Sequence, residues 1–128
     1  MDALTMDSAL AWVAGLARCL LAAPFLLSAL LKLHDWSGGL DEVRALALPM
    51  PALALVATVT LQLGGGLMLV LGWQVRWAAA ALAAFTLMAS VLAHPFWRVR
   101  GWQRQHHRMT FAEHLAIVGG LLWVVAHG

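Results

Sequence analysis

The 128-residue sequence has few charged residues and one cysteine, and both shortages exclude common kinds of protein. Charged residues make up 11% of the chain and hydrophobic residues 62%, which is more apolar surface than a soluble domain of this length buries. The single thiol, Cys19, excludes an internal disulfide and a two-cysteine redox relay, so we expect a buried side chain that packs as a small apolar group. The formal net charge of +2 is too small to indicate a nucleic-acid partner.

Three local patterns are also missing. Met1 to Ser8 contain no Lys or Arg, so they do not match a cleavable signal peptide, and we expect the first apolar run to be retained as a helix. No His-x-x-His or Cys-x-x-Cys pair occurs, so no metal site is predicted. The glycines at 64–66 lie inside an apolar run with no Lys-Ser or Lys-Thr after them, which favours close helix packing over a phosphate loop.

The sequence is dominated by four long apolar runs, at about 9–33, 52–73, 77–94 and 110–126. A membrane crossing needs about 20 apolar residues, so each run is near the length of one crossing. We therefore predict an all-α fold, an integral membrane four-helix bundle in a lipid bilayer, with residues 1–128 as a single transmembrane domain. Between the first two helices we expect a turn at 36–39 and a short interfacial helix over 40–48, ended by Pro49 and Pro51.

The seven tryptophans lie at the ends of the apolar runs. A Trp ring has an apolar body and one N–H donor, so it prefers the boundary between lipid and water. Threading the chain four times through a bilayer divides the tryptophans between the two boundaries. One set is Trp12, Trp73, Trp77 and Trp123, and the other is Trp36, Trp97 and Trp102.

Basic residues concentrate on one side of the predicted bundle. That side holds Lys32, Arg44, Arg98, Arg100, Arg104 and Arg108, whereas the other side holds Arg76. The positive-inside rule therefore predicts that the basic loops and the histidines near them face the cytoplasm and that both termini face outward. The four arginines of the last loop, Arg98, Arg100, Arg104 and Arg108, are candidates for binding anionic lipid or an acidic protein partner.

Five of the six histidines fall on the same side as the basic loops, because two helices end there and the last one begins there. Polar residues on the third run are spaced by four, and those around the start of the fourth run by three and four, so each set forms a stripe on one helix face. The stripes are Thr86, Ser90 and His94, and His107, Thr110 and His114. The candidate ligand site at this face consists of Lys32, His94, Glu113 and His114.

Three interpretations of this cluster are open. In the first, Glu113 neutralises Lys32 or a loop arginine, and the histidines are hydrated at the headgroup level. In the second, the cluster binds a quinone, since histidine donates to a quinone oxygen and His or Glu passes protons when the ring is reduced. In the third, two histidines on facing helices ligate haem iron, which has less support because no metal-binding spacing accompanies them.

Arg18 and Gln62 are expected well inside the bilayer at similar depth. An arginine without a partner is costly there. We therefore predict that Arg18 faces the bundle interior and bonds Gln62, forming a polar clasp between the first two long helices.

Several short motifs occur in an order that resembles the DoxX family of small four-helix bacterial membrane proteins. They are Arg18 to Ser28 with Leu31-Lys32-Leu33, Leu48-Pro49 with Pro51-Ala52, Gln62 to Gly66 with Leu71-Gly72, His94-Pro95-Phe96-Trp97, and Phe111 to Leu115 with Gly119-Gly120-Leu121. The resemblance covers nearly the whole chain. It implies a bacterial inner-membrane protein associated with redox metabolism, because the family name comes from a membrane subunit of a thiosulfate:quinone oxidoreductase.

Two positions differ from the pattern of that family. Its members usually have Glu where this chain has Gln62, and commonly Lys-Asn where it has Glu113-His114. The first difference removes a carboxylate, and the second inverts a charge and adds an imidazole. Both are consistent with a specialised subgroup whose polar cluster serves another partner or ligand.

The sequence therefore leaves more than one function open. We favour a membrane subunit of a redox system, an oxidoreductase subunit rather than a stand-alone enzyme, that anchors a redox protein partner and offers a quinone site. The alternative is a non-catalytic anchor or assembly module that binds a protein partner or anionic lipid. A transporter is a weaker third hypothesis, because four helices leave little room for a pathway unless a homo-oligomer forms; small residues at 79–81 would permit such contacts.

Overall fold

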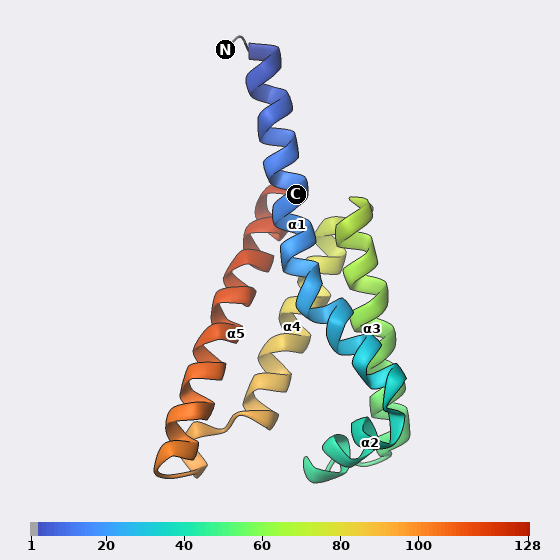
Figure 1. Cartoon of the computed structure of the whole chain (residues 1–128), viewed down its shortest axis with the longest axis vertical. Coiled ribbons are helices and arrows are strands. Elements are labelled where there is room, and N and C mark those ends of the chain that lie inside the picture. The colour runs from blue at the N-terminus through green and yellow to red at the C-terminus, as the bar shows by residue number, and fades with distance from the viewer. Residues whose placement is uncertain (1–2) are drawn as a thin grey trace.

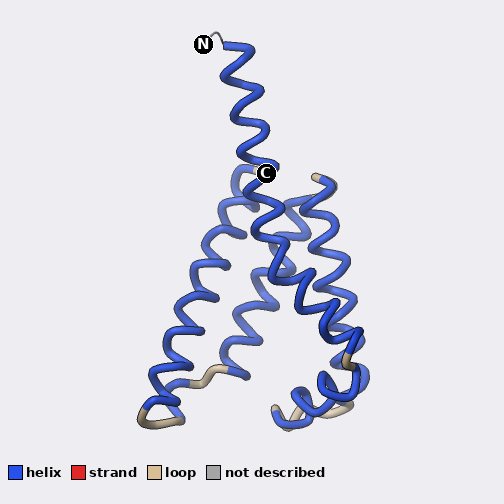
Figure 2. The backbone as a smooth tube through the Cα atoms, viewed as in Figure 1, coloured by secondary structure: helices blue, strands red, loops and turns tan. Residues whose placement is uncertain are grey.

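The computed structural model describes residues 3–128 as five α-helices and one short 3-10 helix (Figure 1). The long helices are α1 (Ala3–His34), α3 (Pro51–Leu71), α4 (Val75–Ala93) and α5 (Trp102–His127). The short elements are α2 (Trp36–Ala45) and the 3-10 helix η1 (Phe96–Arg98). Helices and their connections account for all of the described chain (Figure 2), so the predicted all-α fold is confirmed.

The four long helices are each long and apolar enough to cross a membrane. Their outward faces carry large apolar side chains that are more than half exposed, among them Leu20, Leu53, Met88 and Leu122. Water does not tolerate such an extensive apolar surface, whereas hydrocarbon chains solvate it readily. The predicted four-helix integral membrane bundle is therefore confirmed.

The bundle has two chemically distinct ends. Both termini lie at one of them (Figure 1), which we call the terminal end. The other, formed by α2, η1 and the first turns of α5, we call the basic end, because it carries Arg44, Arg98, Arg100, Arg104 and Arg108. Exposed tryptophans mark both, with Trp73, Trp77 and Trp123 near the terminal end and Trp97 and Trp102 near the basic end.

A closed apolar core holds the helices together in the terminal half of the bundle. Each of the four long helices contributes to it, through Ala22, Phe25, Leu69, Leu82 and Leu121, all of which are at most 5% exposed. Alanines of α4 belong to the same core and allow its backbone to lie close to its neighbours.

A second, separate core lies toward the basic end, on one side of the bundle only. It consists of Ala29 of α1, Val43 of α2, and Leu55 and Val59 of α3. Because α2 packs on α1 and α3, the basic end has two distinct sides, one built from α1, α2 and α3 and the other from α4, η1 and α5 (Figure 1).

The start of α2 differs from the sequence prediction. The segment 36–39, expected as a turn before a helix at 40–48, forms the first turn of α2, which ends at Ala45. The Asp35 side chain accepts a hydrogen bond from the Gly38 backbone N–H at 3.0 Å and so caps the helix. A Cβ on Gly39 would lie 3.2 Å from Leu55 Cδ1, so this glycine serves close docking of α2 on α3 rather than breaking the helix.

The start of α5 also differs, because the helix begins at Trp102 rather than at Thr110. The loop expected over 95–109 therefore contains η1 and about two turns of α5. Phe96 and Phe111 rings pack edge to face with centroids 5.5 Å apart, and Trp97 joins them at 6.0 Å from Phe111. This aromatic contact holds η1 against α5 and orders a polar segment whose composition resembles a loop.

The glycines of α3 serve packing, as predicted, but not all of them do. A Cβ on Gly65 would lie 3.0 Å from Leu82 Cγ on α4, and one on Gly66 would lie 2.7 Å from Leu26 Cδ2 on α1. Gly64 has nothing within 4 Å. Two adjacent glycines thus admit side chains from two different helices, which places α3 between α1 and α4.

Candidate functional site

A cavity of about 630 Å³ lies between the two sides of the bundle, toward the basic end. All five α-helices contribute to its wall. Most of the lining is apolar, as in small-molecule sites, which typically have volumes of about 300–1,000 Å³. The polar side chains in the wall are Ser28, Lys32, Glu42, Thr58, Gln62, Thr86, His94 and His114.

Lys32 joins this wall from the last turn of α1. Its Nζ donates a hydrogen bond to Ser28 Oγ, one helical turn earlier, at 2.6 Å. The bond holds the ammonium group alongside α1, where it lines the cavity instead of extending past the end of the helix. A cation is therefore available to a ligand with a carbonyl, hydroxyl or anionic group.

The polar stripes of α4 and α5 meet, as their spacing predicts. The distance from Ser90 Oγ to His114 Nδ1 is 2.6 Å, and Ser90 is 1% exposed. The rings of His94 and His114 are edge to face, with centroids 5.3 Å apart. The bond to Ser90 uses Nδ1 of His114 and so leaves Nε2 of this cavity-lining ring for another partner.

Two further histidines extend this cluster from the cavity to the surface. His94 Nδ1 lies 3.1 Å from His107 Nδ1, and the rings of His107 and His106 have centroids 5.7 Å apart. His106 is exposed at the basic end. A hydrogen bond between two ring nitrogens needs one donor and one acceptor, so one of the two Nδ1 atoms is unprotonated. The four imidazoles thus form a chain of titratable groups from the cavity to the exposed surface.

Gln62 is the most buried polar side chain of α3 that lines the cavity, at 6% exposed. Among the described residues, its Oε1 is the buried side-chain acceptor that has no hydrogen-bond partner. An unpaired buried amide oxygen costs about 1–3 kcal/mol relative to a paired one. Gln62 therefore brings to the cavity wall an amide whose acceptor none of the described residues uses.

The predicted clasp between Arg18 and Gln62 does not form. Arg18 Nε donates to the backbone oxygen of Leu69 at 3.1 Å, and its guanidinium lies beside Gly72, which caps α3. This position suits a cation, because the C-terminal carbonyls of a helix carry partial negative charge. The register of α1 on α3 explains the error: Gly66 packs against Leu26, so Arg18 is level with the end of α3, about two turns beyond Gln62.

Glu113 does not belong to the site, although the sequence placed it there with Lys32, His94 and His114. Its side chain is exposed and is not part of the cavity wall. The first interpretation, in which Glu113 neutralises Lys32 or a loop arginine, is not supported: over residues 3–128, the ion pair present joins Arg44 and Asp41 of α2 at 3.6 Å. Helical geometry explains this, because His114 faces α4 and the residue before it is rotated by about 100° toward the outside.

The four candidate arginines lie at the basic end, and all are exposed. They are Arg98, Arg100, Arg104 and Arg108. The Arg108 guanidinium lies 6.0 Å from the centroid of the Phe96 ring, at the outer limit of a cation–π contact. The side chains therefore present positive charge to whatever faces this end of the protein.

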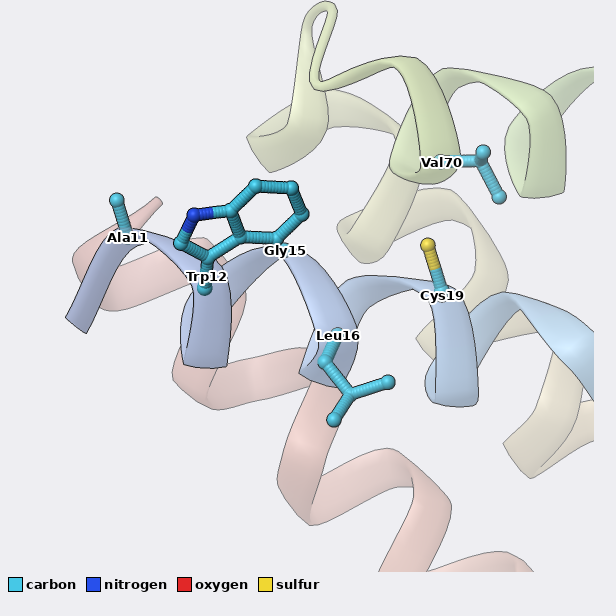
Figure 3. A pocket seen from close by; sticks show the side chains of 6 residues that line it. All are labelled: Ala11, Trp12, Gly15, Leu16, Cys19 and Val70. Atoms are coloured by element: carbon cyan, nitrogen blue, oxygen red, sulfur yellow. The ribbon is translucent and has the colours of Figure 1, made fainter. Parts of the chain in front are cut away.

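A second hollow, of about 480 Å³, lies on the outside of α1 near the terminal end (Figure 3). It is lined by Ala11, Trp12, Gly15, Leu16, Cys19 and Val70, and Figure 3 shows Cys19 and Val70 on facing helices. Cys19 is exposed, so the expectation of a buried thiol is wrong. Cys19 lies seven residues before Leu26, on the same face of α1 that packs on α3, but the hollow at its level leaves the thiol exposed.

Sequence reasoning missed several polar residues of the cavity wall: Ser28, Glu42 and Thr58, together with the role of Gln62. A signal for some of them was present. Ser28 precedes Lys32 by four residues, and Thr58 precedes Gln62 by four, so each pair lies on one helix face. Glu42 offered no such signal, because its position depends on how α2 docks.

The fold and the cavity define a four-helix membrane protein with a polar pocket near one membrane face. A family model described as DoxX matches residues 13–95 of this chain, and the chain belongs to the DoxX family. The matched segment contains Lys32, Gln62 and His94, whereas the histidines of α5 lie beyond it.

A relative among curated proteins agrees with this assignment. The inner membrane protein YphA of Escherichia coli (strain K12) is 25% identical over 113 residues, which cover 88% of this chain and 81% of that protein. Together with the four apolar helices, this relative confirms the predicted multi-pass inner-membrane location. No solved structure matches the chain.

Proposed function

We propose that this protein is a membrane subunit of a redox system and binds a quinone in the cavity between α1–α3 and α4–α5. The observation that carries the proposal is the cavity itself: an apolar space of about 630 Å³ with basic and hydrogen-bonding side chains in its wall. A quinone combines an apolar ring and tail with two polar oxygens, so it needs both kinds of surface. Membership of the DoxX family agrees with a membrane role and leaves the ligand open.

Two residues of the wall would each hold one of the two quinone oxygens. Lys32 Nζ has N–H groups beyond the one that it gives to Ser28, and His114 has Nε2 beyond the Nδ1 that it shares with Ser90. Both lie in the wall of the same cavity but on opposite sides of the bundle. A ligand with two polar oxygens would therefore be oriented by one donor from α1 and one from α5.

A bound quinone would supply two-electron redox chemistry that consumes or releases two protons. The chain of histidines supports the proton part, because His94 contacts both the cavity and His107, and His106 is exposed. Protons would move between neighbouring imidazoles toward the aqueous phase. Electrons would come from a redox protein partner that docks at the basic end, where Arg98, Arg100 and Arg104 are exposed.

The proposal is tested by equilibrium binding of decylubiquinone to the protein in phosphatidylcholine nanodiscs. We expect His114→Leu to weaken binding about threefold to tenfold, the effect of one lost hydrogen bond. The matched control is His34→Leu, because His34 lies near the same end of the bundle but is exposed and outside the cavity wall. Equal binding by both variants and the wild type, or no binding by any of them, would refute a quinone site at His114.

A non-catalytic anchor is the second candidate function, and the exposed arginines of the basic end favour it. In this function the arginines would bind an acidic partner or anionic lipid, and the cavity would have no specific ligand. Native mass spectrometry of the protein extracted gently from its membrane separates the two. Retained quinone mass supports the redox function, whereas a protein partner retained without any quinone supports the anchor.

A further inference from the structure

The buried amide of Gln62 limits the chemistry of a ligand in the cavity. Its side chain is 6% exposed and lies in the cavity wall, yet Oε1 accepts no hydrogen bond from the described residues. Thr86, which also lies in the cavity wall, is likewise buried but donates its hydroxyl to the Leu82 backbone oxygen at 2.7 Å. The hydroxyl of Thr86 is thus satisfied within its own helix, whereas the acceptor of Gln62 is not.

Only a ligand that carries a hydrogen-bond donor would satisfy this acceptor. The oxygens of a quinone are carbonyl oxygens, which accept but do not donate. The corresponding quinol has two hydroxyl groups, and each of them both donates and accepts. A quinol can therefore pair with Gln62 Oε1 on α3 as well as with the donors on α1 and α5. A quinone pairs with donors alone, the Gln62 Nε2–H groups included, and leaves Oε1 unpaired.

We propose that the cavity preferentially binds the quinol form, with the Gln62 amide turned so that its Oε1 accepts a hydrogen bond from a hydroxyl group of the ligand. This inference rests on the proposed quinone-binding function and adds the redox state that the site selects. Gln62 is thereby a specificity-determining residue of the site. Preferential binding of the reduced form also raises the reduction potential of the bound couple, by about 30 mV for each tenfold difference in affinity.

The experiment compares the affinities of decylubiquinol, decylubiquinone and the dimethyl ether of decylubiquinol under anaerobic conditions, in phosphatidylcholine nanodiscs. The ether keeps the shape of the reduced ring but has no donor. We expect wild-type protein to bind the quinol about tenfold more tightly than the quinone or the ether, the effect of pairing one buried acceptor. In Gln62→Leu the preference for the quinol over the quinone and the ether should disappear.

The matched control is Gln105→Leu, the same substitution at an exposed position of α5 outside the cavity wall, which should keep the preference. Equal affinities for quinol and quinone in wild type, or a preference that persists in Gln62→Leu, would overturn the inference and leave the proposed function standing. Binding of none of the three ligands would refute the proposed function and the inference with it.

A lipid hydroxyl group is another source of the same donor. Adding phosphatidylglycerol to the nanodiscs provides a glycerol headgroup with free hydroxyls, whereas phosphatidylcholine has none. Unchanged quinol affinity supports the quinol assignment. Competitive loss of quinol binding that depends on Gln62 would assign the donor to lipid and overturn it.

Discussion

At the scale of single residues, two polar side chains of the long helices differ in whether their hydrogen-bonding groups are paired. Arg18 carries a full charge but is satisfied, since its Nε bonds the Leu69 carbonyl near the capped end of α3. Gln62 is neutral but its Oε1 is unpaired and buried. The charged residue is therefore a local structural contact, and the neutral one is the better indicator of function, because natural proteins rarely leave a buried acceptor unpaired without a reason.

The unpaired Oε1 of Gln62 leads to a prediction about the stability of the ligand-free protein. Replacing Gln62 by Leu removes the unpaired acceptor and keeps a similar volume, so we expect ligand-free protein in detergent to become more stable by about 1–3 kcal/mol. Thermal unfolding of purified protein measures the change. The Gln105→Leu variant, at an exposed position, is expected to unfold at the wild-type temperature. A lower unfolding temperature for Gln62→Leu would mean that the amide is satisfied in the folded protein.

At the scale of helices, small residues decide which elements pack closely. Adjacent glycines in α3 face different neighbours: Gly65 faces Leu82 of α4, and Gly66 faces Leu26 of α1. Gly64, one position earlier, faces open space. Three consecutive glycines thus have distinct roles, which their identical side chains do not reveal.

This difference predicts opposite outcomes for one substitution at two neighbouring sites. Gly66→Leu would push α1 away from α3 and is expected to destabilise the bundle by about 1–3 kcal/mol, as overpacking does. Gly64→Leu places the same side chain in open space and is expected to have little effect. Thermal unfolding in detergent compares the two variants. Similar losses in both would contradict the packing of Gly66 against Leu26.

At the scale of the whole molecule, charge is distributed unequally between the two ends of the bundle. Arg98, Arg100 and Arg104 are exposed at the basic end, together with the exposed end of the histidine chain. The positive-inside rule predicts that the basic end, with the proposed proton route and the proposed docking surface, faces the cytoplasm. The cavity would then exchange protons with the cytoplasm rather than with the opposite compartment.

This orientation is tested with single cysteines in a Cys19→Ala background, labelled with a membrane-impermeant maleimide. We expect Arg100→Cys to react in inverted inner-membrane vesicles and to stay unlabelled in intact spheroplasts. Arg76→Cys, in the exposed second residue of α4 near the terminal end, is expected to show the reverse pattern and serves as the control. Labelling of Arg100→Cys in spheroplasts would place the basic end outside the cytoplasm.

The sequence by itself determined the class of this protein, because each apolar run must satisfy its backbone within its own segment once it is in lipid. Four runs of sufficient length therefore predict four helices, and the spacing of Ser90, His94, His107 and His114 predicts stripes that face one another. These features depend on local periodicity and composition. They need no knowledge of which helix packs against which.

Only the tertiary structure decided which side chains meet, because those contacts depend on the register and rotation of one helix relative to another. The contact of Gly66 with Leu26 sets α1 against α3, which puts Arg18 near Gly72 and leaves Gln62 in the cavity wall. Rotation of α5 turns His114 inward and Glu113 outward. The segment 36–39, predicted as a turn, is helical because α2 docks on Leu55. The segment 95–109, predicted as a loop, is ordered because η1 packs on Phe111. Side-chain contacts between distant segments determine these outcomes, and a local pattern does not contain them.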